Sequence, residues 1–178
     1  VVFDAKGKYL RSWGKGMFGN AHGMRVDRNR KIWVTDNGDQ QVFRFDHTGK
    51  LELTLGIKGK AATDEKTFNR PTDIAFSPDG RFVYVSDGYG NSRVMKFTYD
   101  GKFVSTWGTP GSAPSQFNTV HSVAVDSRGT VYVSDRENNR IQMFTPEGKL
   151  LRIWTHLGST QNIFIAPNDE FWMITHRE

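Results

Sequence analysis

Two histidines stand at matching points of two similar phrases of this sequence. The phrases are HGMRVD, from His22, and HSVAVD, from His121, and each opens on its histidine and closes on an aspartate. Each histidine also precedes a further aspartate by 14 residues, Asp36 (36 minus 22) and Asp135 (135 minus 121). Imidazole is the commonest neutral ligand of zinc, and catalytic zinc commonly has three protein ligands and one open position. The pair indicates part of a metal site, whereas either histidine alone would suit a capping or packing role.

Two more reactive groups follow aspartates of the same kind. Tyr89 lies two residues after Asp87, and Arg136 directly follows Asp135. A phenol can transfer a proton, and a guanidinium can pair with both oxygens of a carboxylate. Taken singly, Tyr89 would suit a surface rim, and Arg136 would suit an ion pair with a nearby acid such as Glu137.

The elements that must position these residues repeat along the chain. Three similar segments begin at Lys31, Arg81 and Thr130, and each has a β-rich run ending in aspartate, a polar loop, a second β-run, a Gly-Lys turn and a third β-run. Their aspartates are 51 and 48 residues apart (87 minus 36 and 135 minus 87), about the length of one propeller blade. A further run precedes each segment, which makes four strands per unit. Because the strands are apolar on both faces, their sheets must be sandwiched between neighbours, as propeller blades are.

We therefore predict an all-β fold, a β-propeller of four-stranded blades that forms one domain over residues 1–178. The expected units are a half blade at 1–14, blades at 22–56, 71–108 and 121–155, and a half blade at 161–178, about four blades' worth in all. Two interpretations follow. The chain is a piece of a larger ring cut within a blade at both ends, or its two halves pair and close a four-bladed ring. The absence of a starting methionine favours the piece.

Strand polarity predicts where the reactive groups meet. In an antiparallel blade the first strand begins on the face where the second strand ends. His22 and His121 begin first strands, so they should share one mouth of the channel with the loops that carry Tyr89 and Arg136. The equivalent position is Thr72 in the second unit and Asn162 in the last, and neither is a convincing zinc ligand.

Composition excludes several classes of protein. The chain has 178 residues, a formal charge of +5, 37% hydrophobic residues and no cysteine. Disulfides and thiolate metal ligands are therefore excluded. No apolar run approaches the roughly 18 residues needed to span a bilayer. Basic residues are scattered among acidic ones rather than clustered, so nucleic acid is a poor candidate partner.

The phrases resemble NHL repeats, which build six-bladed β-propellers, and the resemblance covers nearly the whole chain. Within that family the chain is similar to peptidyl-α-hydroxyglycine α-amidating lyase, through HGMRVD with WVTD, PTDIAF, SDGYGNSR, QFNTVHSVAV and DRENNRIQMF in the same order. SDGYGNSR and DRENNRIQ are the more specific segments. The resemblance implies cleavage of the N–Cα bond of a peptidyl-α-hydroxyglycine, or of a small α-hydroxy amide, to an amide and glyoxylate. It also favours a secreted or periplasmic protein.

Roles follow from the resemblance residue by residue. His22 and His121 correspond to two of three zinc-binding histidines, and the third belongs to a later blade absent from this sequence. Tyr89 corresponds to the proposed general base and Arg136 to a substrate-binding arginine. The backbone carbonyl of Met24 corresponds to a ligand of a structural calcium. Gly90 stands where animal lyases have cysteine, which indicates a bacterial-type relative; lyase activity requires that the full-length protein complete the site.

Two other functions remain open on the sequence. A non-catalytic propeller could bind a protein, a peptide or RNA across one ring face. A calcium-dependent lactonase-like hydrolase is the third possibility, but such sites need acids and amides at the channel, where this chain mostly has histidine and threonine. The oligomeric state is not indicated.

Overall fold

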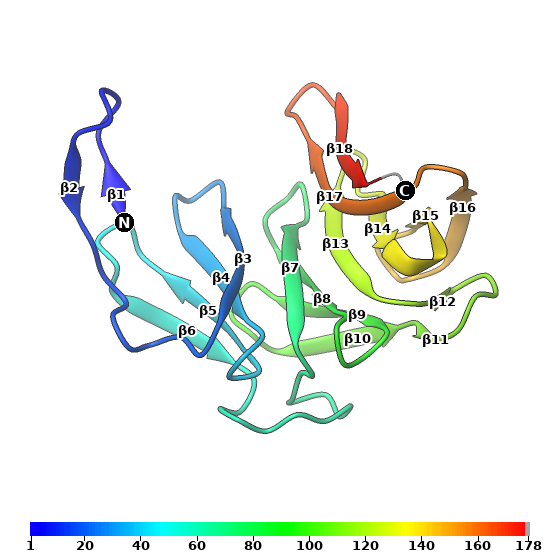
Figure 1. The fold of residues 1–178 in the computed structure, drawn as a ribbon, viewed down its shortest axis with the longest axis horizontal. Coiled ribbons are helices and arrows are strands. Elements are labelled where there is room, and N and C mark those ends of the chain that lie inside the picture. Colours follow the sequence, from blue (N-terminus) through cyan, green and yellow to red (C-terminus); the bar gives the residue numbers. More distant parts are fainter. Residues whose placement is uncertain (177–178) are drawn as a thin grey trace.

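The computed structural model describes residues 1–176, which form mainly short β-strands. Three four-stranded antiparallel sheets succeed one another along the chain (Figure 1), which confirms the all-β prediction of four-stranded units. The first sheet contains β3 (Ala21–Val26), β4 (Ile32–Asp36), β5 (Gln41–Phe45) and β6 (Leu51–Leu55). The second contains β7 (Pro71–Phe76), β8 (Phe82–Asp87), β9 (Arg93–Thr98) and β10 (Phe103–Trp107), and the third contains β13 (Val120–Val125), β14 (Val131–Asp135), β15 (Arg140–Phe144) and β16 (Leu150–Trp154).

Two-stranded hairpins lie at both ends of this arc of sheets (Figure 1). They are β1 (Val2–Phe3) with β2 (Tyr9–Arg11) and β17 (Ser159–Ile165) with β18 (Phe171–His176), so the last two residues of the predicted half blade 161–178 lie outside the described part. The remaining elements are the parallel pair β11 (Thr109–Pro110) with β12 (Gln116–Phe117) and a 3₁₀ turn at Arg136–Asn138. No helix among residues 1–176 has the length and apolar character needed to cross a membrane.

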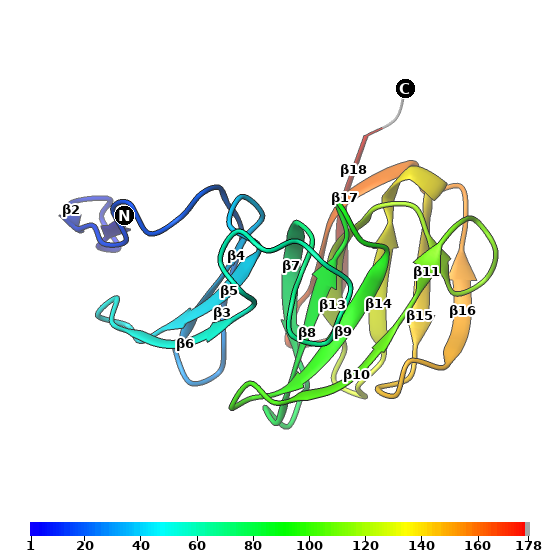
Figure 2. The same cartoon turned by 90° about the horizontal axis from the view of Figure 1, so that it is seen from below.

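The first strand of each sheet lies on the inner side of the arc. β7 contacts both β3 and β13, and β13 contacts β17, so these four inner strands stand next to one another. The second, third and fourth strands of each sheet follow outward in order. Figure 2, seen from below, shows the second and third sheets stacked face to face. The arrangement is that of successive propeller blades.

The hydrophobic core lies between sheets rather than inside one. One buried cluster joins Trp33 and Val42 of the first sheet to Ile74 and Met95 of the second. Similar clusters join the second sheet to the third, and the third to Ile163 of β17. This explains why the strands are apolar on both faces, since each sheet is covered by its neighbours.

Local hydrogen bonds close the turn between the first and second strand of two blades. The carboxylate of Asp27 accepts from the backbone N–H groups of Asn29 and Lys31 at 2.8 and 2.9 Å. Asp126 forms the same pattern in the third blade. An aspartate that binds backbone two and four residues ahead favours a tight turn, and here it fixes the entry into the second strand.

The aspartate that ends each second strand organises the loops at the opposite end. Asp36, Asp87 and Asp135 are fully buried and accept backbone N–H groups from the segment before the inner strand, for example Gly19 and Asn20 for Asp36 at 2.8 Å each. These aspartates therefore shape the loops through backbone hydrogen bonds. Because Asp87 is desolvated by burial, its pKa is raised, even though the hydrogen bonds it accepts oppose that rise.

One glycine sets how closely the second and third blades approach at this end. A Cβ on Gly88 would lie 1.7 Å from the carbonyl oxygen of Val120, which opens the third blade's inner strand. Since that contact is to backbone, the clash can be relieved only by moving one blade away from the other. Gly88 immediately precedes Tyr89, so this contact also determines where the phenol lies.

We predict that Gly88→Ala lowers the free energy of unfolding by about 1–3 kcal/mol or more, the usual cost of overpacking. Gly16→Asn is the control, because a Cβ at Gly16 meets no atom within 4 Å and asparagine tolerates its positive φ of 74°. Urea unfolding of the two variants measures the difference. Equal stabilities would show that the blades do not need this close approach.

Candidate functional site

His22 and His121 face each other at one mouth of the inner strands. Each is the second residue of its strand, β3 or β13, and their ring centroids are 5.3 Å apart. In both strands the pairing with the second strand shifts over the histidine, between Ala21 and Met24 and between Val120 and Val123. Such bulges re-aim side chains. The structure thus brings together two imidazoles that are 99 positions apart in the chain (121 minus 22).

Backbone carbonyls of the neighbouring blades fix the tautomer of both rings. Nδ1 of His22 lies 2.8 Å from the carbonyl oxygen of Thr72, and Nδ1 of His121 lies 2.6 Å from that of Gln161. A carbonyl oxygen can only accept, so each neutral ring must carry its proton on Nδ1. The lone pair of each Nε2 is then directed into the mouth. This is the arrangement in which a second hydrogen bond orients a metal-binding histidine.

The carbonyl acceptors occupy the same place in each blade. Ile163 of β17 pairs with Met173 of β18 in the same way as Met24 of β3 pairs with Val34 of β4, so Ile163 and Met24 are equivalent. Two residues earlier in each strand, Gln161 is therefore the equivalent of His22. The prediction that Asn162 is the equivalent of the histidines is therefore wrong by one residue. The pairing of β17 with β18 shifts between Thr160 and Asn162, and that irregularity cannot be read from residue types.

Tyr89 lies between the two histidines. Its hydroxyl oxygen is 2.8 Å from Nε2 of His121 and 3.2 Å from Nε2 of His22. Both nitrogens are acceptors in this tautomer, and a phenol has one proton, so it donates to one ring at a time. The shorter distance favours His121. Two lone pairs and one oxygen thus converge on the same point, an arrangement suited to a cation or to a proton in transfer.

Two guanidinium groups lie against the Tyr89 ring. The Cζ atom of Arg136 is 5.4 Å from the ring centroid, and its Nη1 lies 3.5 Å from the phenol oxygen. Nε of Arg136 also pairs with Glu137 at 2.7 Å, which confirms the ion pair, while its role in a site stays a prediction. Arg70, which the sequence reasoning missed, places its Cζ atom 5.3 Å from the same centroid. The mouth is therefore positively charged around the phenol.

Burial affects the imidazole of His121. Desolvation is the largest influence and lowers its pKa below the usual 6.5, while the hydrogen bond to Gln161 acts in the opposite direction. The positive charge of Arg136 lowers the pKa further. The ring is thus kept neutral, which is the form that binds a metal ion.

The donor set fits zinc in type but supplies two protein ligands. Two Nε2 lone pairs with Nδ1 bound to carbonyls are what a histidine zinc site requires. Within residues 1–176, no group of three His, Cys, Asp or Glu side chains is placed to hold a metal ion. Met24, the predicted calcium ligand through its carbonyl, lies in β3 two residues beyond His22, with its side chain 66% exposed.

The fold and the site define a class of protein, a β-propeller of four-stranded blades whose inner strands present histidines at one mouth. A sequence profile described as an NHL repeat matches residues 18–45, and one described as SMP-30/Gluconolactonase/LRE-like region matches residues 52–166. The chain belongs to this SMP-30/gluconolactonase/LRE-like family of propellers.

Curated relatives add a more specific similarity. The chain is 39% identical over 145 residues to the peptidyl-glycine alpha-amidating monooxygenase of Mus musculus, covering 78% of this chain and 15% of that protein. It is 36% identical over 142 residues to a probable peptidyl-alpha-hydroxyglycine alpha-amidating lyase of Caenorhabditis elegans, covering 78% and 40%. It is also 32% identical over 149 residues to NHL repeat-containing protein 3 of Mus musculus, covering 78% and 42%. The chain therefore spans less than half of each of these relatives.

Solved structures support the fold alone. A streptogramin B lyase superposes with a TM-score of 0.73 at 17% identity, covering 97% of this chain and 53% of that one. A gluconolactonase from Xanthomonas campestris superposes with a TM-score of 0.71 at 20% identity, covering 97% and 61%. Proteins of different activity share this architecture, so the site must carry the argument for function.

The lowered pKa of His121 predicts a pH effect on stability in metal-free protein. Between the folded-state pKa and 6.5, the unfolded chain binds a proton at this ring and the folded chain does not. The free energy of unfolding should therefore fall as the pH drops through this window and level off below the folded-state pKa. His121→Gln should lack this component. Urea unfolding with a chelator between about pH 5 and pH 8 tests it, and parallel curves for the two proteins would contradict it.

Proposed function

We propose that this chain forms part of a zinc-dependent lyase that cleaves the N–Cα bond of a C-terminal α-hydroxyglycine, giving a peptide amide and glyoxylate. One observation carries the proposal: Nε2 of His22 and Nε2 of His121 converge on the Tyr89 hydroxyl while both Nδ1 atoms are bound to carbonyls. The relatives named as alpha-amidating lyases, at 34–38% identity, support it.

His22 and His121 would hold the zinc through Nε2, and a third ligand would come from outside the described residues. A bound zinc ion would act as a Lewis acid on the substrate hydroxyl and make its proton easier to remove. The chain's own contribution is to keep the His121 ring neutral and to orient both rings. Gly23 assists this, because a Cβ there would lie 2.5 Å from the carbonyl oxygen of Thr72 that binds Nδ1 of His22.

Tyr89 is placed to take the hydroxyl proton. When that proton leaves, the electron pair of the O–H bond forms the C=O bond of glyoxylate, the N–Cα bond breaks, and its electrons go to the amide nitrogen, which takes the proton from Tyr89. The oxygen of Tyr89 must first have given up its own proton to water, because Nε2 of His121, 2.8 Å away, would be occupied by the zinc. The Cζ atoms of Arg70 and Arg136 lie 5.3 and 5.4 Å from the centroid of the Tyr89 ring.

Arg136 is placed to bind the substrate carboxylate. Its Nε pairs with Glu137, which leaves the Nη atoms directed toward the mouth near Tyr89. A carboxylate there would lie beside the reacting carbon, and a guanidinium can hold both of its oxygens.

A structural calcium bound by the Met24 carbonyl belongs to the same proposal. Calcium takes six to eight oxygen ligands, so the remaining ones would come from other segments and from water.

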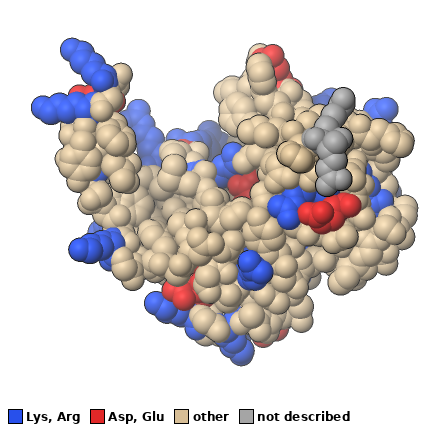
Figure 3. All heavy atoms as spheres, viewed as in Figure 1, with Lys and Arg blue, Asp and Glu red and all other residues tan. Residues whose placement is uncertain are grey.

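The second candidate is a non-catalytic propeller that binds a peptide at the same mouth. The exposed guanidinium of Arg70 beside the aromatic ring of Tyr89 would suit a peptide carboxylate even without a metal. RNA is less well supported, because on the face shown in Figure 3 the lysines and arginines are scattered rather than joined in a stripe. A calcium-dependent lactonase is the least supported, because residues 22, 72, 121 and 161 at the mouth are His, Thr, His and Gln, with no carboxylate.

We predict that Tyr89→Phe in the full-length protein lowers kcat for glyoxylate release from an N-acyl-α-hydroxyglycine by roughly 10²–10⁴, the usual contribution of a proton-transfer group. Zinc content should be unchanged in this variant and lost in His22→Ala and His121→Ala. Tyr9→Phe is the matched control, because the Tyr9 hydroxyl contacts only the exposed Ser12 side chain, far from the mouth along the arc.

Two results would remove the lyase proposal. One is the absence of stoichiometric zinc in wild-type protein, measured by elemental analysis. The other is glyoxylate release by Tyr89→Phe at the rate of Tyr9→Phe. Peptide binding without either zinc or turnover would favour the second candidate.

A further inference from the structure

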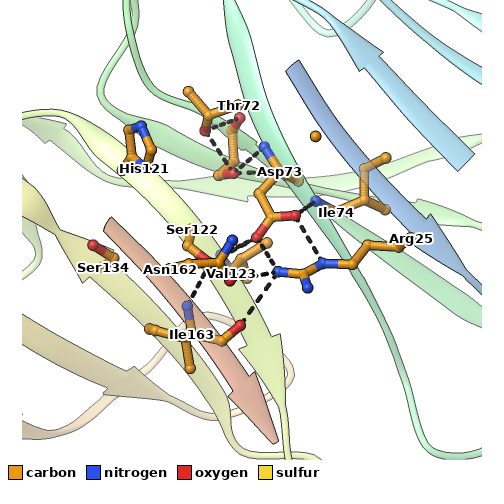
Figure 4. Close-up of polar contacts among 12 residues, drawn as sticks. Arg25, Thr72, Asp73, Ile74, His121, Ser122, Val123, Ser134, Asn162 and Ile163 are labelled. Atoms are coloured by element: carbon orange, nitrogen blue, oxygen red, sulfur yellow. Dashed lines mark hydrogen bonds and ion pairs between the residues drawn. The ribbon is translucent and has the colours of Figure 1, made fainter. Parts of the chain in front are cut away.

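A polar network crosses the inner strands next to the histidine pair (Figure 4). Its centre is the carboxylate of Asp73 on β7, which is 4% exposed. Asp73 accepts from Nε and Nη2 of Arg25 at 3.0 and 2.6 Å and from Oγ of Ser122 at 2.6 Å. It also accepts the backbone N–H of its neighbour Ile74 at 2.8 Å. One carboxylate thus ties three inner strands together.

Arg25 extends the network to the fourth inner strand. Its Nη2 also lies 3.1 Å from Oδ1 of Asn162 and 3.2 Å from the carbonyl oxygen of Ile163, both on β17. Figure 4 shows the guanidinium reaching from β3 past Asp73 to this strand. Ser122 completes a second route, since its Oγ accepts the backbone N–H of Ile163 at 3.1 Å. Residues 138 positions apart (163 minus 25) are therefore held together directly.

Each member of the network is next in sequence, or nearly so, to a group that holds the histidines. Asp73 follows Thr72, whose carbonyl binds His22, and Ser122 follows His121 itself. Asn162 follows Gln161, whose carbonyl binds His121. Arg25 lies three residues after His22 on the same strand. A shift of one inner strand relative to another would therefore move a histidine away from its carbonyl acceptor.

We propose that Arg25, Asp73 and Ser122 are positioning residues that set the separation and tautomer of His22 and His121. They form no hydrogen bond with either histidine ring or with the Tyr89 side chain, and they act by fixing the relative position of the four inner strands. The positioning of the histidines is inferred from the hydrogen bonds described above. The expected effect on zinc affinity rests on the proposed function. Charge contributes to the effect, because a buried carboxylate paired with a guanidinium in two hydrogen bonds resists displacement in a way that apolar contacts do not.

The matched pair of variants is Arg25→Met and Arg28→Met. Both arginines come from the first blade and contact the second. Arg25 binds Asp73, and Nη1 of Arg28 donates to the carbonyl of Pro78 at 3.0 Å. Arg28, however, lies in the turn at the end of β3 remote from His22. Ser122→Ala is the second variant and removes only a hydroxyl. Circular dichroism and thermal unfolding identify the variants that fold.

The first measurement uses metal-free protein labelled with ¹⁵N at histidine. Wild type and Arg28→Met should show His22 and His121 with the proton on Nδ1, as the carbonyl acceptors require. Arg25→Met and Ser122→Ala should show mixed tautomers at one or both rings. If both keep the wild-type tautomers, the network does not position the histidines and the proposal is overturned.

The second measurement is the affinity for zinc, by competition with a chelator. Loss of outer contacts to metal-binding histidines typically weakens binding 10- to 100-fold. We expect zinc affinity to fall about tenfold in Arg25→Met and to stay unchanged in Arg28→Met. Arg25→Lys should lie between them, because lysine keeps the positive charge but cannot form the two parallel hydrogen bonds of the guanidinium. Equal affinities in all three would overturn the zinc consequence. If wild type binds no zinc, the proposed function fails while the histidine spectra still decide the positioning role.

Discussion

Each histidine of the mouth depends on a backbone carbonyl that belongs to another blade. His22 is oriented by Thr72 and His121 by Gln161, so neither ring is fixed by its own sheet. This interaction requires inner strands that stand side by side at a fixed height. Blade stacking supplies that condition, because the apolar clusters between sheets resist sliding as well as separation. The chemistry of the site is therefore a consequence of packing between repeats.

The repeat itself is built by short-range interactions. A buried aspartate closes the loops at the mouth, and another turns the first strand into the second at the far end. These contacts recur with small changes from blade to blade. The far-end turn spans up to four residues, and the contacts at the mouth join residues 16 to 18 positions apart. They explain how an ordinary set of turns can present loops of different content, such as those with Tyr89 and Arg136, in equivalent places.

Family membership and local chemistry answer different questions here. The SMP-30/gluconolactonase/LRE-like profile and the superposed propellers account for the architecture, and proteins with different activities share it. The local chemistry of this chain is the pair of imidazoles around a phenol, with Arg70 and Arg136 against the ring and a carboxylate network beside it. The relatives named as alpha-amidating lyases match 77–78% of the chain, which is why the lyase proposal is the most specific one that we make for the site.

The sequence by itself determined the period, the four strands of each unit and the convergence of His22, His121, Tyr89 and Arg136 at one mouth. It could do so because strand polarity follows from local turns and the positions repeat. Tertiary structure alone decided the rest: the carbonyl partners that set the tautomers, Arg70 beside the phenol, Gln161 rather than Asn162 in the equivalent place, and the reach of Arg25 to Asp73 and β17. These features arise where bulges break the strand period or where side chains join blades distant in sequence, and neither a bulge nor a long-range contact is encoded in the spacing of nearby residues.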